Sequence, residues 1–152
     1  MDIVDKAKRS KMMSAITATN TEPEMVVRRI LHNAGFRYRL HDKKLPGTPD
    51  IVLSKYRAVI EVRGCFWHRH NCHLFKWPSS RREFWHEKLQ RNFDRDLANE
   101  KAIIGKGWRI LIVWECALKG KSKLGREQLE ERLFSWMDSS GEIGHISGSC
   151  IP

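Results

Sequence analysis

Two acidic residues, Asp50 and Glu61, have the types and the spacing of a divalent-cation site. Asp50 follows Pro49 at the start of one apolar run, and Glu61 lies near the end of the next, so an antiparallel hairpin would bring the carboxylates together. Mg²⁺ commonly takes one or two carboxylates together with water and phosphate oxygens. A cation held there can polarise a phosphate and activate a water, so the pair predicts phosphodiester hydrolysis. Solvated surface acids are the alternative.

The same residues resemble the PD-(D/E)-x-K nuclease motif, with Arg63 in the place of its lysine. Arginine stays protonated, so Arg63 could stabilise charge in a transition state but could not act as a base. A Pro-Asp pair and a strand glutamate also occur by chance in many proteins. The motif alone therefore does not establish a nuclease.

A second group of residues has the composition of a structural metal site. Cys65, His70 and Cys72 lie close together in the chain, and Cys116 follows a later apolar run. Three thiolates and one imidazole form a tetrahedral ligand set for structural Zn²⁺, which would hold the aromatic loop against the sheet. The alternative is a set of buried free cysteines beside a surface loop rich in histidine.

The elements that must position these residues follow from periodicity and capping signals. Four strands are expected, at residues 36–40, 51–53, 58–62 and 108–114. Thr21 to Glu24 and Ser80 to Glu83 have the spacing of capping boxes, one for a helix that ends at Gly35 and one for a long polar helix that ends near Gly105. Further helices are expected at about 5–19, where the chain is basic, and at 126–137. The Gly/Ser-rich tail at about 139–152 predicts no element.

These elements predict a single α/β domain over residues 1–152, with a central mixed sheet flanked by helices. The resemblance of the acidic motif implies a PD-(D/E)-x-K nuclease-like core, and the Cys/His group adds a structural zinc site. The chain has 152 residues, 41% of them hydrophobic, which suffices for one buried core. We see no internal repeat or linker. Without a coiled-coil heptad, the expectation is a monomer.

The charge favours a polyanionic partner. Lys and Arg number 28 against 18 Asp and Glu, and the formal net charge is +10, which points first to nucleic acid. A membrane surface would account for the charge as well, but not for the motifs. The absence of a long apolar stretch and of a signal-peptide pattern predicts a cytoplasmic protein without a membrane partner.

Several separated motifs give the chain a specific resemblance. Gly64-Cys65-Phe66-Trp67-His68, followed by His70 and Cys72, is similar to the signature of the very-short-patch repair (Vsr) mismatch endonucleases. Other motifs follow in the family's order between Asp5 and about Met137, namely Lys8 to Met13, Leu45 to Asp50, Glu83 to Trp85 and Trp108 to Cys116. The resemblance implies a nuclease core with structural zinc. It also implies Mg²⁺-dependent nicking of duplex DNA 5′ of the thymine of a T:G mispair, which serves the repair of deaminated 5-methylcytosine.

The resemblance further implies roles for single residues. Asp50 would be the principal Mg²⁺ ligand; the carboxylate pair described above adds Glu61, and the backbone of Val62 would lie beside them. His68 would be a general acid or base near the leaving group, and Asp96 would orient it by accepting its second ring proton. Glu24 would reach a metal-bound water, a role that competes with capping. The candidate catalytic residues are thus Glu24, Asp50, Glu61, Arg63, His68 and Asp96.

Seven residues would contact DNA by resemblance: Phe66, Trp67 and Trp85 as intercalating aromatics, Met13 and Ile16 from the opposite groove, and Lys88 and Asn92 near the mispair. Inserted apolar side chains unstack base steps at least cost where pairing is already defective, so mismatch selectivity can begin in deformability. Core packing is the alternative for Met13 and Ile16. An ordinary helix surface is the alternative for Lys88 and Asn92.

Glu61 and Arg63 depart from the family pattern, which tends to have an apolar residue at the first position and a different residue at the second. Two alternatives stay open as a result. One is a restriction-type or nicking endonuclease that acts on intact duplex DNA, and the other is a non-catalytic zinc-stapled DNA-binding module. The flanking sequence, and any methyltransferase or repair-protein partner, are not specified by these residues.

Overall fold

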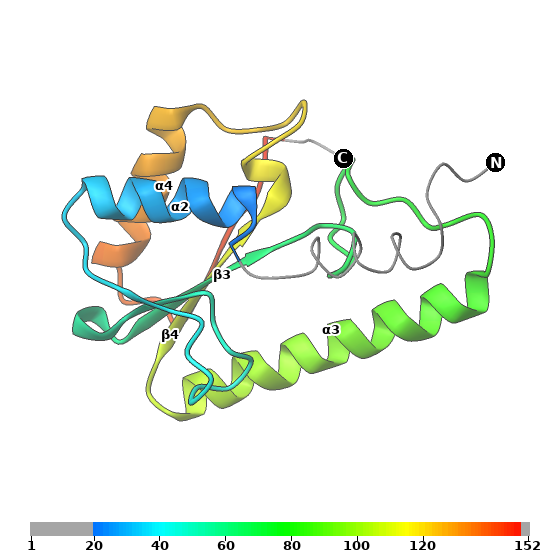
Figure 1. Ribbon diagram of the computed structural model, residues 1–152, viewed down its shortest axis with the longest axis horizontal. Coiled ribbons are helices and arrows are strands. Elements are labelled where there is room, and N and C mark those ends of the chain that lie inside the picture. Colours follow the sequence, from blue (N-terminus) through cyan, green and yellow to red (C-terminus); the bar gives the residue numbers. More distant parts are fainter. Residues whose placement is uncertain (1–19, 150–152) are drawn as a thin grey trace.

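The structure, a computed structural model, describes residues 20–149. The predicted helix at about 5–19, with Met13 and Ile16, lies outside the described residues, as does Cys150. Within the described part of the chain, five strands form one sheet in the order β1-β2-β3-β4-β5. Helices α2 and α4 lie on one side of this sheet and α3 on the other (Figure 1). The predicted mixed sheet flanked by helices is confirmed.

The sheet is antiparallel at one end and parallel at the other. Strands β1 (Arg39–Leu40), β2 (Ile51–Leu53) and β3 (Ala58–Arg63) pair antiparallel, with Ile51 opposite Ile60 in the predicted hairpin. Strands β4 (Arg109–Trp114) and β5 (Ile143–Ile146) add on parallel to β3. The antiparallel pairing places the residue before β2 beside the end of β3, where the two predicted acids lie.

Strand β5 lies in the tail for which no element was expected, and that expectation was wrong. Its sequence, Ile-Gly-His-Ile, is too short to show a period, and its conformation comes from pairing with β4. Gly144 lets the Trp136 ring of α4 pack directly on the strand, since a Cβ there would lie 2.3 Å from Trp136 Nε1. The tertiary contact, not the local sequence, makes this segment a strand.

The two predicted capping boxes behave differently. Helix α2 (Glu22–Asn33) has Thr21 as its N-cap, and the Thr21 hydroxyl accepts from the Glu24 N–H at 3.4 Å. Helix α3 (Arg82–Gly105) begins without a side-chain cap, because Arg81 precedes it in the left-handed region at φ 53°. The Ser80 capping box was therefore wrong, while the long helix it was meant to start is present.

Each face of the sheet has its own core. Val27 and Leu31 of α2 and Leu133 of α4 pack on the face that presents Ile51 and Ile60. Ile103 of α3 packs on the opposite face, with residues that alternate with the first set: Val52, Val59, Ile110 and Ile112. The alternation follows from the two-residue period of a strand. Helix α4 spans Arg126–Asp138, and none of the described helices is long and apolar enough to cross a membrane.

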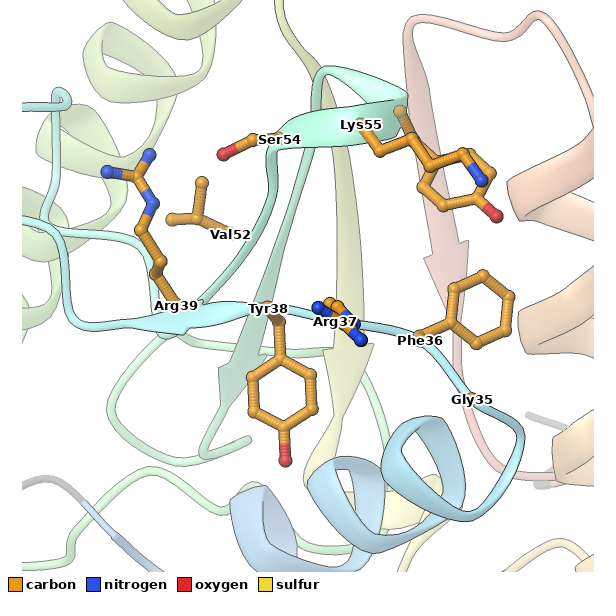
Figure 2. Close-up of a pocket in the computed structure, with 9 residues that line it drawn as sticks. Gly35, Phe36, Arg37, Tyr38, Arg39, Val52, Ser54 and Lys55 are labelled. Atoms are coloured by element: carbon orange, nitrogen blue, oxygen red, sulfur yellow. The ribbon is translucent and has the colours of Figure 1, made fainter.

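A cavity of about 370 Å³ lies over β1 and the turn after β2 (Figure 2). Its walls combine aromatic and basic side chains, including Phe36, Tyr38, Tyr56, Arg37 and Lys55. None of the predicted site residues lines it. The candidate site must therefore be sought among side chains gathered elsewhere on the sheet.

Candidate active site and metal centre

The Asp50 carboxylate is fixed across the β2–β3 pair. Its Oδ2 accepts a hydrogen bond from the Val62 backbone N–H at 2.8 Å. Burial raises the pKa of Asp50 to about 7, and the nearby carboxylates of Glu24 and Glu61 add to this rise, while the Val62 N–H opposes it. A bound cation would favour the charged carboxylate and remove this penalty, so the donor chemistry fits a divalent metal.

Asp50 lies in a cluster with Glu24 and His41, whose possible ligand atoms all fall within 4.8 Å of one another. Glu24, on α2, is only 2% exposed, and its Oε2 lies 2.9 Å from His41 Nε2 and 3.4 Å from Arg28 Nη1. The carboxylate thus turns toward the cluster, while Thr21 caps the helix with its hydroxyl. The cap uses the backbone N–H of Glu24 and not its carboxylate, so capping does not compete with the predicted reach of Glu24 to a metal-bound water, which stays a prediction.

His41 was missed in the sequence. It follows β1, and its backbone N–H donates to the carbonyl oxygen of Asp50 at 3.0 Å. The predicted strand at 36–40 could have revealed it, because the residue after a strand that pairs with Ile51 must lie beside Asp50. The sequence order alone, with eight residues between the two, gave no reason to pair them.

Glu61 and Arg63 bind each other. Glu61 Oε2 accepts from Arg63 Nη2 at 2.6 Å and from Nε at 3.0 Å, and Arg63 Nη1 lies 3.4 Å from Glu100 of α3. Burial raises the pKa of Glu61, and Arg63 opposes that rise. Burial opposes the charge of Arg63, but Glu61, Asp96 and Glu100 raise its pKa above the usual value. The hairpin places Glu61 opposite Asp50, but its carboxylate is engaged by Arg63 and is not part of the group formed by Glu24, His41 and Asp50.

His68 and Asp96 form the pair that the resemblance implied. His68, in the loop after β3, places Nδ1 2.6 Å from Asp96 Oδ2 on α3. When Nδ1–H donates to this carboxylate, Nε2 of the neutral ring is left as an acceptor. The long helix therefore holds the imidazole in one tautomer and one orientation.

The four predicted zinc ligands converge. Possible ligand atoms of Cys65, His70, Cys72 and Cys116 lie within 4.8 Å of one another. His70 Nδ1 lies 3.5 Å from the Cys65 sulfur and 3.6 Å from that of Cys116. Burial raises the pKa of both of these thiols, and burial lowers the pKa of His70. Three thiols and one imidazole around a common centre fit a metal ion.

Neighbouring groups orient this Cys/His cluster. The Cys65 N–H donates to Glu115 Oε1 at 3.1 Å, and the Gly148 N–H donates to the Cys116 sulfur at 3.3 Å. The His70 ring stacks on Trp114 with 4.1 Å between centroids. Contacts of this kind hold the ligands in place at known metal sites, and they fix the orientation of the side chains in this cluster.

The three predicted intercalating aromatics lie together. Ring centroids of Phe66 and Trp67 are 5.2 Å apart, those of Phe66 and Trp85 5.4 Å, and those of Trp67 and Trp85 5.9 Å. Asn92 Nδ2 donates to the Trp67 carbonyl oxygen at 3.1 Å, and Lys88 lies one turn earlier on α3. Loop and helix thus meet in one aromatic surface.

Three further aromatics of this region, Phe75, Trp77 and Phe84, were not predicted as site residues. Trp77 is 41% exposed and stacks on His86 at 3.9 Å, and Phe84 is 39% exposed. Phe75 links Trp77 to Phe66, with centroid distances of 5.0 and 6.0 Å. The density of aromatic residues between Gly64 and Trp85 was the signal that could have identified them.

The mixed sheet with an acidic cluster at the β2–β3 end defines a nuclease core of the PD-(D/E)-x-K type, which here also carries a Cys/His cluster that could hold a metal ion. A family model described as "DNA mismatch endonuclease Vsr" matches residues 1–74. The chain is 47% identical over 145 residues to the DNA mismatch endonuclease Vsr of Escherichia coli (strain K12), an alignment that covers 95% of this chain and 93% of the relative. The chain belongs to the Vsr mismatch endonuclease family and is a DNA endonuclease.

Other relatives carry a different name. The chain is 44% identical over 139 residues to "Type II nicking enzyme V.XorIIP" of Xanthomonas oryzae pv. oryzae, covering 91% of this chain and 98% of that protein. It is 45% identical over 128 residues to "Type II nicking enzyme V.NmeAIP" of Neisseria meningitidis serogroup A, covering 84% and 91%. The relatives are thus named both as a mismatch endonuclease and as nicking enzymes, and the names alone do not specify the DNA substrate of this chain.

Proposed function

We propose that this endonuclease nicks one strand of duplex DNA 5′ of the thymine of a T:G mispair, in very-short-patch repair of deaminated 5-methylcytosine. The observation that carries the proposal is the placement of the oriented His68–Asp96 pair and the aromatic surface on the same loop and helix. A cleavage group and base-wedging groups that share a support can act on one disrupted base step. The enzyme acts as a monomer in the cytoplasm.

Asp50 and Glu24, with Glu61 and the Val62 backbone as further candidates, would hold the catalytic Mg²⁺. When bound, Mg²⁺ supplies charge neutralisation at the phosphate and lowers the pKa of a coordinated water. The raised pKa of Asp50 supports this assignment, because a carboxyl group buried among other acids gains most from a neighbouring cation. Zn²⁺, held by the Cys/His cluster, would be structural.

His68 would transfer a proton at the leaving group. Asp96 keeps Nδ1 protonated, so Nε2 is the atom that accepts or donates a proton toward the DNA. Arg63 would influence the phosphate through its charge and not through direct contact, because Glu61 and Glu100 hold its guanidinium. It keeps this part of the sheet from carrying an excess of negative charge near a phosphate.

Phe66, Trp67 and Trp85 would enter the base stack, with Lys88 and Asn92 supporting the loop from α3. Met13 and Ile16 would approach from the opposite groove. A mispair lowers the cost of unstacking, so the same contacts discriminate against intact duplexes without a full set of base-edge hydrogen bonds. The formal net charge of +10 supports a sequence-independent contribution from phosphate contacts.

A second candidate function is nicking of an intact duplex. The two relatives named type II nicking enzymes favour it, and so does the Glu61–Arg63 pair, by which this chain departs from the pattern expected of the mismatch enzymes. The two functions differ in whether the mispair is required.

Strand-labelled duplexes that are identical except for one T:G mispair test the proposal. We expect a Mg²⁺-dependent nick only in the thymine strand of the mispaired duplex, in at least one of several flanking contexts. Equal nicking of the matched duplex would favour the second candidate function. Binding without cleavage in any context would contradict both and leave a DNA-binding module.

A further inference from the structure

One member of the Asp50 cluster has no role in the proposed mechanism. We propose that His41 is a positioning residue of the cation site: its ring N–H donates to Glu24 Oε2 and fixes the side-chain orientation in which that carboxylate faces Asp50. The inference rests on the proposed function, because Glu24 and Asp50 serve the cation there. Glu24 and His41 come from different elements, α2 and the end of β1.

The backbone locks His41 to Asp50. Leu40 pairs with Ile51 in the β1–β2 ladder, and one residue further on the His41 N–H donates to the Asp50 carbonyl oxygen at 3.0 Å. The sheet therefore fixes the backbone of His41 next to that of Asp50. A flexible surface histidine would have no such constraint.

The conformation of His41 is unfavourable for a residue with a side chain. Its φ is +48°, in the left-handed region that L-residues rarely adopt. Strained backbone positions persist where the surrounding structure imposes them, and they gather at functional sites. Glycine would relieve the strain at His41, so the imidazole is present there against the preference of the backbone.

The ring contact satisfies a carboxylate that is almost fully buried. The Glu24 side chain is 3% exposed and that of His41 is 19% exposed, and the contact between Nε2 and Oε2 is 2.9 Å. The other donor, Arg28 Nη1, lies further away at 3.4 Å and also donates to Asn20 at 2.7 Å. His41 is thus the closer of the two donors that orient Glu24.

Cation binding without DNA separates positioning from a merely structural contact. The zinc-loaded full chain is titrated with Mn²⁺, followed by electron paramagnetic resonance and calorimetry, for the parent and for His41→Gly, His41→Gln and His32→Ala. His41→Gly keeps the backbone conformation, and His41→Gln keeps an N–H donor. His32, exposed on α2, controls for adventitious binding by a surface imidazole.

We expect His41→Gly to weaken Mn²⁺ binding about 10- to 100-fold, the usual effect of removing a group that orders a metal ligand. Its Tm should stay near that of the parent, because glycine relieves the positive φ while the buried Glu24 carboxylate loses a donor. His41→Gln should recover most of the affinity, and His32→Ala should bind as the parent does. In cleavage assays, His41→Gly should need more Mg²⁺ while its KM for DNA is unchanged.

Mn²⁺ affinity equal to the parent's in His41→Gly would overturn the inference. An undiminished effect of His41→Gly in a Glu24→Gln background would also overturn it, because His41 would then not act through Glu24. Asp50→Asn distinguishes this failure from failure of the proposed function. If Asp50→Asn binds Mn²⁺ as the parent does, the cation site itself is misplaced; if it loses binding while His41→Gly does not, only the role of His41 is wrong.

Discussion

The Cys/His cluster and the Asp50 cluster are assembled in different ways. Three members of the first, Cys65, His70 and Cys72, come from one short loop, and Cys116 comes from the 3-10 helix Glu115–Ala117 that follows β4. The members of the second come from α2, from the end of β1 and from the start of β2. Most of the first cluster therefore lies within one stretch of sequence, and Cys116 supplies its fourth possible ligand. The second exists only when the helix and the sheet are both in place, and its carboxylates repel one another until a cation arrives.

Cys116→Ser should have the largest effect, and it should fall on the fold. Structural Zn²⁺ contributes on the order of 10 kcal/mol in small zinc domains, and loss of the remote ligand opens the tetrahedral set. We expect loss of bound zinc and a lower Tm, measured by metal analysis and thermal unfolding. The exposed-tail variant Ser149→Ala is the control. Retention of zinc with an unchanged Tm would show that the cluster is not a structural metal site.

Asp50→Ala should have the next largest effect, and it should fall on cleavage alone. Removal of the principal cation ligand is expected to slow Mg²⁺-dependent nicking by about 1,000-fold or more, while zinc content and DNA affinity stay near those of the parent. Single-turnover cleavage and filter binding measure the two quantities. Nicking at the parent's rate would show that Asp50 is not needed for cleavage. The contrast between a structural Cys/His cluster and a catalytic Asp50 cluster would then fail.

Asp96→Asn should slow nicking by about 100-fold without loss of either metal, because the amide can favour the wrong tautomer of His68. His68→Asn in the same assay should give a similar loss, and the double variant should lose little more, because the two side chains act as a unit. Additive losses would mean that Asp96 does not act through His68.

The smallest effect concerns pH. The pKa of Asp50 is raised from 3.8 to about 7 in the folded protein. Between these two pH values the folded protein keeps a proton that the unfolded chain has already lost, so the free energy of unfolding falls as pH rises through this range. Without Mg²⁺, we expect the free energy of unfolding to decrease by about 2 kcal/mol between about pH 5.5 and 7.5 from this group. Asp50→Asn should flatten the dependence, as followed by urea unfolding with zinc present. An unchanged slope in that variant would contradict the assignment.

The sequence predicted the helices and strands whose signals are local. Thr21 caps α2, the β2–β3 hairpin forms, and the apolar run 109–114 becomes a central strand. Ser80 gave an equally good capping pattern, but the chain enters α3 through a left-handed Arg81, whose guanidinium lies 4.2 Å from the Phe84 ring centroid. A capping motif thus predicts the presence of a nearby helix more reliably than it predicts the contact at which that helix begins.

The candidate site divides in the same way. Residues tied to short motifs were found, and His68 meets Asp96 as the resemblance implied. His41 was missed because its partner Glu24 lies 17 positions away and only the three-dimensional arrangement of α2 and β1 joins them. The Glu61–Arg63 contact could have been predicted, because side chains two residues apart on a strand point to the same face. There the salt bridge competes with metal binding.

Strand β5 makes the order of synthesis matter for this enzyme. The last strand of the sheet and the Gly148 N–H that contacts the Cys116 sulfur both come from the C-terminal end of the described chain. A nascent chain that has emerged only as far as α4 can form the β2–β3 hairpin, but it has neither the parallel β4–β5 pairing nor this support for the metal centre. An interrupted translation product would therefore carry the catalytic motifs without the finished scaffold that holds them.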